Sequence, residues 1–502
     1  MLDSFSGGEN TIGEDQELKA NEARAIQNWD SISVGGMVRS NGFTKQVDAT
    51  GSYTAKPLDM LGHHYEGTSV RNYGIINGDL GRVNGSSFTV TDSAAFTAGV
   101  LSHSQTAGSA FWITNTTDNL KYTTIAGSIT VPTDKPSSAC ARIYYHKSRL
   151  IAEGGSPVVY GSRAGSGTAT WAAAGGWSTS GDAWNITMPD LTQGCIPGFP
   201  SPDQVTVFTL GATFYLYNFP NIAYQPVNIN RGCSAPYSIA YGKEGAFFVS
   251  QFPTLGVFLW DTVNFTNLTL YEGFVNDINF SNRIYGVYRG NQYYLFYSSL
   301  ANGQSYTDTL KVFDARFGRW MSRPINAAVS DSFGYPKIFI KPTNDLWAGS
   351  SQKAIMYQLE SGTSDAGQTT NANYITKDFT SNDFTVDGQA QFPLSEVRMK
   401  LLKVSVTYYG TTGNFSLQWT ADRGLRSGAQ IFDLTGQGDL INTTFIVNTS
   451  LIAGLPSAKT TTRSFDNSAI GSRFSFQILQ NGSGVIPEIK RIKIFAVALQ
   501  ES

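Results

Sequence analysis

A short succession of strands recurs along the middle of this sequence, and it constrains the fold more than any other feature. Between about residues 60 and 360, an apolar strand, a tight turn, an aromatic strand and a further strand follow one another repeatedly. The aromatic strands begin near Phe247, Tyr293 and Leu346, which are 46 and 53 residues apart. A multi-strand unit of this period predicts a β-propeller, because a single blade cannot bury both faces and packs against its neighbours around an axis.

Weaker copies of the unit extend the pattern towards the N-terminus, at 205–218, 142–154, 110–125 and 73–83. They bring the expected number of blades to six or seven, some of them degenerate. The alternative is a β-sandwich or a β-solenoid whose segments resemble one another by accident. Composition supports an all-β chain in either case. Only 15% of the residues are charged, against roughly 25% in an average protein. Aromatic residues make up 13% of the chain, and 51 of its 502 residues are glycine.

The regions outside the repeats have different patterns. Residues 14–29 carry apolar side chains at three- to five-residue intervals and predict one short amphipathic helix. Residues 361–390 are polar and turn-rich and predict a linker. Beyond them, five cleanly alternating strands predict a C-terminal β-sandwich. We therefore expect an N-terminal clasp segment at 1–45, a propeller at 46–360, the linker at 361–390 and the sandwich at 391–502.

The sequence offers little chemistry. No two histidines have metal-ligand spacing, and the three cysteines form neither a disulfide framework nor a zinc motif, so we expect no metal and three inert thiols. Phosphate-binding and nucleophile-elbow motifs are absent. We therefore predict no catalytic residue and no cofactor. The four histidines are His63, His64, His103 and His146, and the three cysteines are Cys140, Cys195 and Cys233.

A Gly-rich stretch at 161–182 is interpreted as an exposed loop. Three tryptophans in or near it, Trp171, Trp177 and Trp184, allow two interpretations. Exposed indoles in a loop at 165–190 would stack on sugars, whereas packing between blades is the commoner use of such side chains.

Charge argues against a protein that wraps DNA. The net charge is −2, and clustered positive charge is needed to displace phosphate counterions. Residues 391–502 carry 11 basic and 7 acidic side chains, a net of +4, which leaves −6 for residues 1–390. No apolar stretch approaches the ~18–20 residues of a membrane span, and the polar, acidic start predicts synthesis in a cytoplasm without an export signal. We expect no membrane partner.

The N-terminal 45 residues carry the most specific motif, a set of turn residues followed by one strand. A Gly-Gly-x-Asn-Thr turn and an Asn-Glu-Ala-Arg segment are followed by a Gly-Gly-aliphatic-x-Arg-x-x-Gly-Phe strand. This pattern resembles the opening of tailed-bacteriophage propeller proteins, in particular the packaged-DNA stabilisation or tail nozzle proteins of short-tailed phages. The residues that carry the resemblance are Gly7, Gly8, Asn10, Thr11, Asn21, Glu22, Arg24, Asn28, Gly35, Gly36, Arg39 and Gly42.

The resemblance implies a structural protein of the virion tail, made in the host cytoplasm. It would form a homo-oligomeric, six-fold nozzle or hub ring that extends the portal-adaptor channel. Such a ring would contact head-tail adaptor and tail fibre or spike proteins, and would retain packaged double-stranded DNA and pass it during ejection without binding it tightly. The alternative is a tail-mounted receptor- or glycan-binding propeller. A propeller glycosidase ranks behind both, because acidic residues are scattered singly in turns.

Overall fold

The computed structural model describes most of the residues of the chain. They are Glu9, 23–33, 36–66, 69–124, 128–165, 168–178, 182–270, 272–281, 283–303, 307–323, 336–340, 345–350, 352–362, 364, 371–380, 383, 385–386, 389–390, 397–409, 414–433, 459–480 and 488–499.

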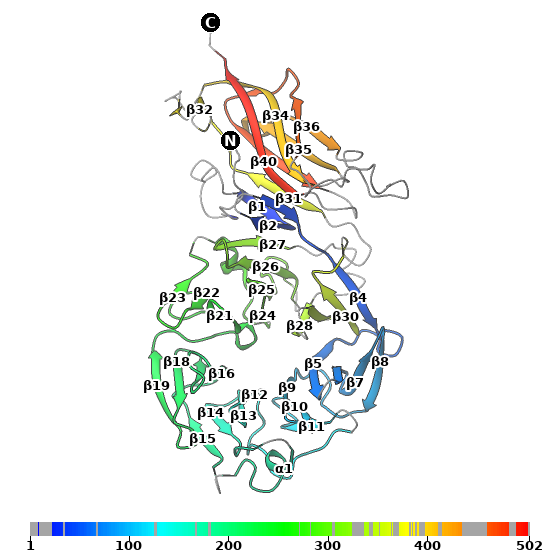
Figure 1. Ribbon diagram of the computed structural model, residues 1–502, viewed down its shortest axis with the longest axis vertical. Coiled ribbons are helices and arrows are strands. Elements are labelled where there is room, and N and C mark those ends of the chain that lie inside the picture. The colour runs from blue at the N-terminus through cyan, green and yellow to red at the C-terminus, as the bar shows by residue number, and fades with distance from the viewer. Residues whose placement is uncertain are drawn as a thin grey trace, which may run out of the picture.

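The described chain is all-β, with one short α-helix and three 3₁₀ turns (Figure 1). These are α1 (Thr168–Trp171), η1 (Pro236–Ser238), η2 (Gly273–Asp277) and η4 (Asp422–Gly424). Within the described residues, no helix has the length and apolar character needed to cross a membrane.

Small antiparallel sheets follow one another along the chain from residue 58 to residue 359. The first three comprise β5 (Leu58–Glu66), β6 (Ser69–Ile76), β7 (Asp79–Asn84) and β8 (Ser87–Asp92); β9 (His103–Ala107), β10 (Ala110–Thr114) and β11 (Lys121–Thr123); and β12 (Arg142–His146), β13 (Arg149–Glu153), β14 (Val158–Gly161) and β15 (Trp184–Thr187). The next two comprise β16 (Thr192–Pro197), β17 (Val205–Thr209), β18 (Thr213–Tyr217) and β19 (Ala223–Asn228); and β20 (Ala240–Gly242), β21 (Gly245–Ser250), β22 (Gly256–Trp260) and β23 (Phe265–Asn267).

Two more groups of strands complete the series. The sixth comprises β24 (Tyr285–Arg289), β25 (Gln292–Tyr297), β26 (Thr309–Asp314) and β27 (Arg319–Ser322). The seventh comprises β28 (Pro336–Ile340), β29 (Leu346–Ser350), β30 (Ile355–Leu359) and, from the N-terminal region, β4 (Phe43–Asp48). The aromatic strands predicted near Phe247, Tyr293 and Leu346 are confirmed as β21, β25 and β29, each the second strand of its group.

The seven groups stand side by side in a propeller-like ring (Figure 1). Their first strands contact one another in turn: β5 with β9, β9 with β12, β12 with β16, β16 with η1 just before β20, β20 with β24, β24 with β28, and β28 with β5. Hydrophobic clusters fill the spaces between neighbours, as one between the first two groups and another between the fourth and fifth illustrate. Each sheet therefore buries its faces against the next one, as the repeat predicts.

Aromatic pairs carry much of this packing. The rings of Tyr73 and Phe111, from the first and second groups, stack with centroids 5.0 Å apart. Phe247 stacks on Tyr293 at 5.0 Å between the fifth and sixth groups. Such offset contacts add roughly 1 kcal/mol each beyond the burial of area. The high aromatic content is thus used at the interfaces between sheets.

Two further sheets lie at the C-terminal end of the molecule. One continues from β27 through β1 (Ala23–Gln27), β31 (Ala372–Thr376), β39 (Phe474–Gln480) and β35 (Asn414–Ala421) to β36 (Arg426–Asp433). The other runs β2 (Trp29–Ser33), β3 (Gly36–Arg39), β40 (Glu488–Ala498), β34 (Met399–Tyr409) and β37 (Lys459–Ser464), with β38 (Ile470–Gly471) paired to β34. A separate hairpin joins β32 (Thr385–Val386) and β33 (Gln389–Ala390).

Side chains from both C-terminal sheets belong to one hydrophobic cluster, which includes Val404, Trp419 and Ile492. Four of the five strands predicted in this region are confirmed as β34, β35, β39 and β40. The fifth, around residues 442–449, lies outside the described residues.

The helix predicted over 14–29 is wrong for its described part. Residues 23–27 and 29–33 are strands β1 and β2, in different sheets, while 14–22 lie outside the described residues. Ile26 and Trp29 are both buried, but they belong to two different strands and do not lie on one face of a helix. Asn28 lies between them with φ of 55° and separates the two strands. Pairing with β31 and β3 overrides a weak local helix preference.

The linker predicted at 361–390 also needs correction. Ala372–Thr376 is strand β31, which pairs with β1 on one side and β39 on the other. Ala372, Tyr374 and Thr376 are buried in alternation with more exposed neighbours. The strand is only five residues long and is surrounded by polar turn residues, so its alternation is too short to be recognised from sequence.

The N-terminal region contributes to both parts of the molecule. Strands β1, β2 and β3 belong to the C-terminal sheets, whereas β4 pairs antiparallel with β30 and completes the seventh group. Phe43 of β4 is 4% exposed, and its ring lies 5.1 Å from that of Tyr357. Val47 of β4 is fully buried. The ring of sheets is therefore closed by a strand from near the start of the chain.

Closure by β4 makes a testable prediction. Phe43→Ala should lower the free energy of unfolding by about 3 kcal/mol, because it removes a buried ring. Lys45→Ala, at an exposed position of the same strand, should cost under about 1 kcal/mol. Urea unfolding measures both. In Phe43→Ala, amide hydrogen exchange should become faster in β30 than in the wild type and should not change in β21. An equal change in exchange rate in the two strands would contradict the closing role of Phe43.

Candidate functional site

Only part of the N-terminal motif lies within the described residues. Gly7, Gly8, Asn10, Thr11, Asn21, Glu22 and Gly35 are outside them. Arg24, Asn28, Gly36, Arg39 and Gly42 are described: Arg24 belongs to β1, Gly36 and Arg39 are the first and last residues of β3, Asn28 lies between β1 and β2, and Gly42 precedes β4.

Asn28 binds segments that are far apart in sequence. Its backbone N–H donates to the carbonyl oxygen of Ser322 at 3.0 Å, and its side-chain amide donates to the carbonyl oxygen of Asn371 at 2.7 Å. The N–H of Ser40 donates back to its carbonyl oxygen at 2.8 Å. Asparagine tolerates the positive φ found here better than most residues. Asn28 therefore connects the sixth group of strands to the C-terminal sheets.

The other described motif residues have similar structural surroundings. Gly42 donates its N–H to Gly362 and accepts one from Ser361, which ties the start of β4 to the end of the ring. Arg39 is 1% exposed at the end of β3. Arg24 lies 4.0 Å from the carboxylate of Asp378. The motif thus brings distant segments together.

Two buried charge clusters reinforce the same junction. Lys311 of β26 lies 3.1 Å from the carboxylate of Glu9 and 2.5 Å from the hydroxyl of Ser322, which itself donates to Glu9. Arg323 forms ion pairs with both Asp30 and Glu360.

Glu272 lies close to the first of these clusters. Burial raises its pKa to about 8, and the neighbouring charge of Glu9 adds to the rise while Lys311 partly opposes it. At neutral pH the carboxyl group is therefore mostly protonated.

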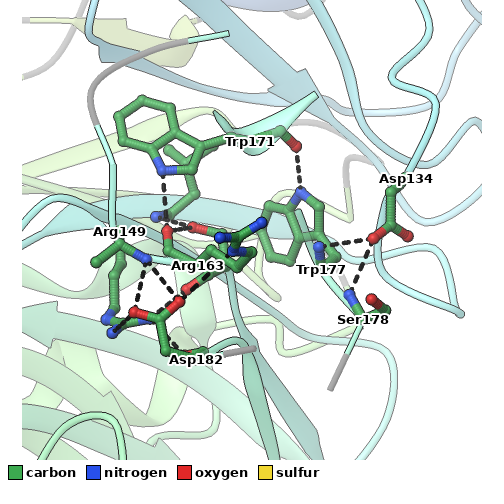
Figure 2. A network of polar contacts seen from close by, with 10 residues as sticks. Asp134, Arg149, Arg163, Trp171, Trp177, Ser178 and Asp182 are labelled. Atoms are coloured by element: carbon green, nitrogen blue, oxygen red, sulfur yellow. Dashed lines mark hydrogen bonds and ion pairs between the residues drawn. The ribbon is translucent and has the colours of Figure 1, made fainter. Parts of the chain in front are cut away.

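The Gly-rich stretch is held in place by two carboxylates (Figure 2). Asp134 accepts the backbone N–H groups of Trp177 and Ser178 at 2.8 and 2.9 Å. Asp182 forms an ion pair with Arg149 at 2.6 Å. Arg149 also donates to the carbonyl oxygen of Ser162 at 2.7 Å.

The exposed loop expected at 161–182 is right only in part: Ala173, Ala174 and Ser178 are exposed, but the rings of the three tryptophans are buried. Trp171, Trp177 and Trp184 are 0%, 6% and 5% exposed. The indole N–H of Trp171 donates to the carbonyl oxygen of Arg163, and that of Trp177 donates to the carbonyl oxygen of Trp171 (Figure 2). Stacking of these rings on sugars is excluded in this arrangement. Packing, the second interpretation, is what the structure shows.

A cavity of about 590 Å³ lies where the first strands of the sheets converge. Its walls come from β5, β9, β12, β16, η1 and β24, which are separated by up to more than 200 residues in the sequence. Two of the four histidines, His63 and His103, line it. Its size falls within the roughly 300–1,000 Å³ of small-molecule sites.

The charge inside the cavity is balanced. Arg142 binds the fully buried carboxylate of Glu153 through two contacts, at 2.6 and 3.1 Å. The hydroxyl of Tyr144 also donates to Glu153, at 3.3 Å. Burial and the nearby charge of Arg142 lower the pKa of His103 to about 4, so this imidazole is neutral at pH 7. Its Nδ1 accepts the N–H of Ile143, which leaves the proton on Nε2.

His63 presents the opposite tautomer. Its Nδ1 lies 2.6 Å from the amide oxygen of Asn72, which can only accept, so Nδ1 carries the proton. Its Nε2 is then an acceptor. That atom is buried and has no hydrogen-bond partner among the described residues. The sequence raises His63 and His103 only as possible metal ligands, because no local signal reveals that strands from distant units converge around them.

Neither metal nor thiol chemistry is organised in the described residues. No three His, Cys, Asp or Glu side chains there come together as a metal site requires. Burial raises the pKa of Cys140 and Cys233 to about 12 and also raises that of Cys195. These three thiols are therefore poor nucleophiles at neutral pH.

Comparisons with known proteins give no family. No protein-family model and no curated protein matches the chain. Among solved structures, the computationally designed Ika8 protein is similar with a TM-score of 0.37 and 10% identity, covering 63% of this chain and 99% of that one. BamB from Moraxella catarrhalis is similar with a TM-score of 0.39 and 10% identity, covering 66% of this chain and 94% of that one. Both TM-scores are too low to carry an argument about function.

The raised pKa of Glu272 predicts how stability depends on pH. A folded pKa above the unfolded value of 4.5 stabilises the fold below pH 4.5, and this contribution is lost as the pH rises towards 8. Glu272→Gln keeps the shape without the ionisation. The free energy of unfolding of the variant, relative to that of the wild type, should therefore rise by roughly 3 kcal/mol between pH 5 and pH 9. Urea unfolding across that range measures the difference, and parallel pH curves for the two proteins would contradict a raised pKa.

Proposed function

We propose that this chain is a structural protein of a bacteriophage tail, a subunit of the nozzle or hub ring, and not an enzyme. The observation that carries the proposal is the location of the N-terminal motif. Of its described members, Asn28 joins the sixth group of strands to the C-terminal sheets, and Gly42 ties the start of β4 to the end of the ring. A motif whose residues hold two parts of a molecule together suits a protein that works by assembly. In this proposal the fold is a seven-bladed β-propeller followed by a β-sandwich.

The outer face of β34 and β40 supports contact with a neighbouring copy. Lys403 is paired with Phe495 and Lys400 with Val497, so these side chains share one face of the sheet. Phe495 and Val497 are 40% and 46% exposed, and Leu402 beside them is 45% exposed. An apolar centre with a basic rim fits an acidic protein surface, and residues 1–390 of the same chain carry a net charge of −6.

Closed rotational symmetry follows naturally from such a contact. A surface that binds a different surface of the next copy generates a ring when the rotation closes. We propose a six-fold ring that meets head-tail adaptor proteins on one side and fibre or spike proteins on the other. Packaged DNA would pass between the copies, because the cavity within one chain, about 590 Å³, has the volume of a small-molecule site.

Two rival functions are less well supported by the arrangement of side chains. A receptor-binding role for the Trp-rich loop requires exposed rings, and these rings are buried. A glycosidase requires two carboxylates that face one substrate. The carboxylate next to the cavity, Glu153, is instead occupied by Arg142 and Tyr144.

The location and copy number of the protein in intact virions test the proposal directly. Electron microscopy of particles that carry a tagged chain should place the tag on the tail axis, below the portal. Quantitative mass spectrometry should give six copies per particle. A position away from the axis, or a trimeric copy number typical of spikes, would overturn the nozzle assignment.

The charge of the chain predicts weak binding to DNA. In filter binding with duplex DNA at about 150 mM salt, the isolated protein should bind no more tightly than ~10⁻⁶ M. The reason is that the 38 Asp and Glu side chains outnumber the 36 Lys and Arg side chains, so the chain has no excess of positive charge to hold the phosphates. A duplex should therefore be released as it passes. Much tighter, steeply salt-dependent retention would identify a DNA-binding protein instead.

A further inference from the structure

A buried lysine and a buried glutamate meet where the start of the chain contacts the ring of sheets. Nζ of Lys311 lies 3.1 Å from Oε2 of Glu9, and the two side chains are 10% and 6% exposed. Ser322 binds both groups, because its hydroxyl donates to Oε2 of Glu9 at 3.0 Å and accepts from Nζ of Lys311 at 2.5 Å. An amine nitrogen is therefore held against a carboxyl group, whose carbon, Cδ, is bonded to the oxygen that the nitrogen contacts.

Aromatic side chains surround this pair. The ring of Phe274 lies 5.0 Å from Nζ of Lys311, and it packs at 5.0 Å against Trp320 and at 6.1 Å against Tyr297. Two opposite charges in such a place have lost their hydration, and their mutual attraction offsets that cost only in part. Replacing both charges by one neutral amide removes the cost. Holding the two groups in contact also favours a reaction between them over the same reaction in free solution.

A second carboxyl group, that of Glu272, lies near the pair and two residues before Phe274 in the sequence. Burial and the charge of Glu9 raise the pKa of Glu272 to about 8 against the opposing charge of Lys311, so this group is mostly protonated at neutral pH. Its Oε2 is buried and has no hydrogen-bond partner among the described residues. One carboxylate is enough to neutralise Lys311, so an ion pair alone does not explain the second carboxyl group. A protonated carboxyl group close to an amine and a carboxylate can carry protons between them.

We propose that Lys311 and Glu9 form an intramolecular isopeptide bond between Nζ and Cδ. The lone pair of the Nζ amine attacks Cδ, a C–N bond forms, and the C–O bond to one carboxyl oxygen breaks. An ammonium and a carboxylate thereby become one amide and one water molecule. Of the three ammonium protons, one stays on the amide nitrogen and two leave with the oxygen, so the step needs no oxidant, reductant or cofactor. Glu272 gives its proton to the departing oxygen and regains one from the nitrogen.

Two other close ion pairs of the chain each lack one of these elements. Arg142 binds Glu153 at 2.6 Å and is equally buried, but a guanidinium does not lose its proton and so provides no nucleophilic nitrogen. Lys377 lies 2.5 Å from Asp383, but the side chain of Asp383 is 19% exposed, and it also accepts the N–H of Thr380 at 2.9 Å. We therefore expect no bond at either pair, and Lys377 provides an internal control.

Mass spectrometry of the denatured wild-type protein tests the bond directly. The intact chain should be lighter than its sequence by the mass of one water molecule. Trypsin should release residues 1–19 joined to residues 290–316, because a modified Lys311 is no longer a cleavage site, and should still cut after Lys377. Fragmentation of the joined peptides should place the link at Glu9 and not at another carboxyl group of residues 1–19. An unshifted mass, with residues 1–19 and 290–311 released separately, would overturn the proposal.

Three variants test the side chains, each made by cell-free synthesis and sampled over time. Lys311→Arg keeps the positive charge but cannot form the bond, so its mass should stay that of its sequence. Glu272→Gln has no proton to transfer and should lose water on the order of 100-fold more slowly than the wild type. Glu360→Gln, the control, removes a carboxylate from the neighbouring ion pair of Arg323 and should link at the wild-type rate. Loss of water from Lys311→Arg would overturn the assignment to Lys311, and a wild-type rate in Glu272→Gln would overturn the role of Glu272.

Electrophoresis under reducing, denaturing conditions gives a second measurement. The bond would join residues 302 positions apart and close a loop that unfolding cannot open. The wild type should therefore migrate faster than Lys311→Arg, because its denatured chain is more compact. Equal migration of the two proteins would contradict the link. None of these results depends on the location of the protein in a virion, so this proposal and the tail proposal fail separately.

Discussion

A ring of sheets must be closed, and here the closing strand comes from near the start of the chain. β4 pairs with β30, and a side-chain hydrogen bond in this pairing joins residues 312 positions apart. Without β4, the backbone groups of β30 would form an open edge, and Phe43 and Val47 would leave the core. The strands that precede β4 enter the C-terminal sheets, so both parts of the molecule depend on one N-terminal segment. The buried charges of Glu9 and Asp30 strengthen the same attachment.

Sequence patterns predicted the repeated units well and the connections between them poorly. The aromatic strands at Phe247, Tyr293 and Leu346 are found as expected, because alternating apolar side chains next to tight turns are a local signal. Residues 23–33 carry a helical spacing but form two strands, because β1 pairs with β31, which lies more than 300 residues away, and β2 pairs with β3 in a hairpin. β31 is hidden in a polar stretch for a similar reason: five residues are too few to show a period.

The candidate site was harder to predict than the fold. The sequence showed four histidines without metal spacing, which led to no expectation for His63 or His103 beyond the absence of a metal. Their tautomers depend on Asn72 and on the backbone of Ile143, and the cavity depends on the convergence of strands from several units. For the tryptophans, the residue type indicated either packing or stacking on sugars, but the sequence did not show whether the rings are exposed. The carboxylates of Asp134 and Asp182 bind described residues of or next to the Gly-rich stretch, to Trp177 and Arg149 respectively (Figure 2).

The sheet that runs from β24 through β27 and β1 to β36 passes from the ring into the C-terminal region without interruption (Figure 1). Two parts of a chain that are joined by a flexible tether can swing and twist independently. Here, the pairing of Gln27 with Ser322 and the hydrogen bond from the N–H of Asn28 to the carbonyl oxygen of Ser322 cross the boundary. In mechanical terms, a force applied to the C-terminal end therefore has a main-chain path into the ring of sheets.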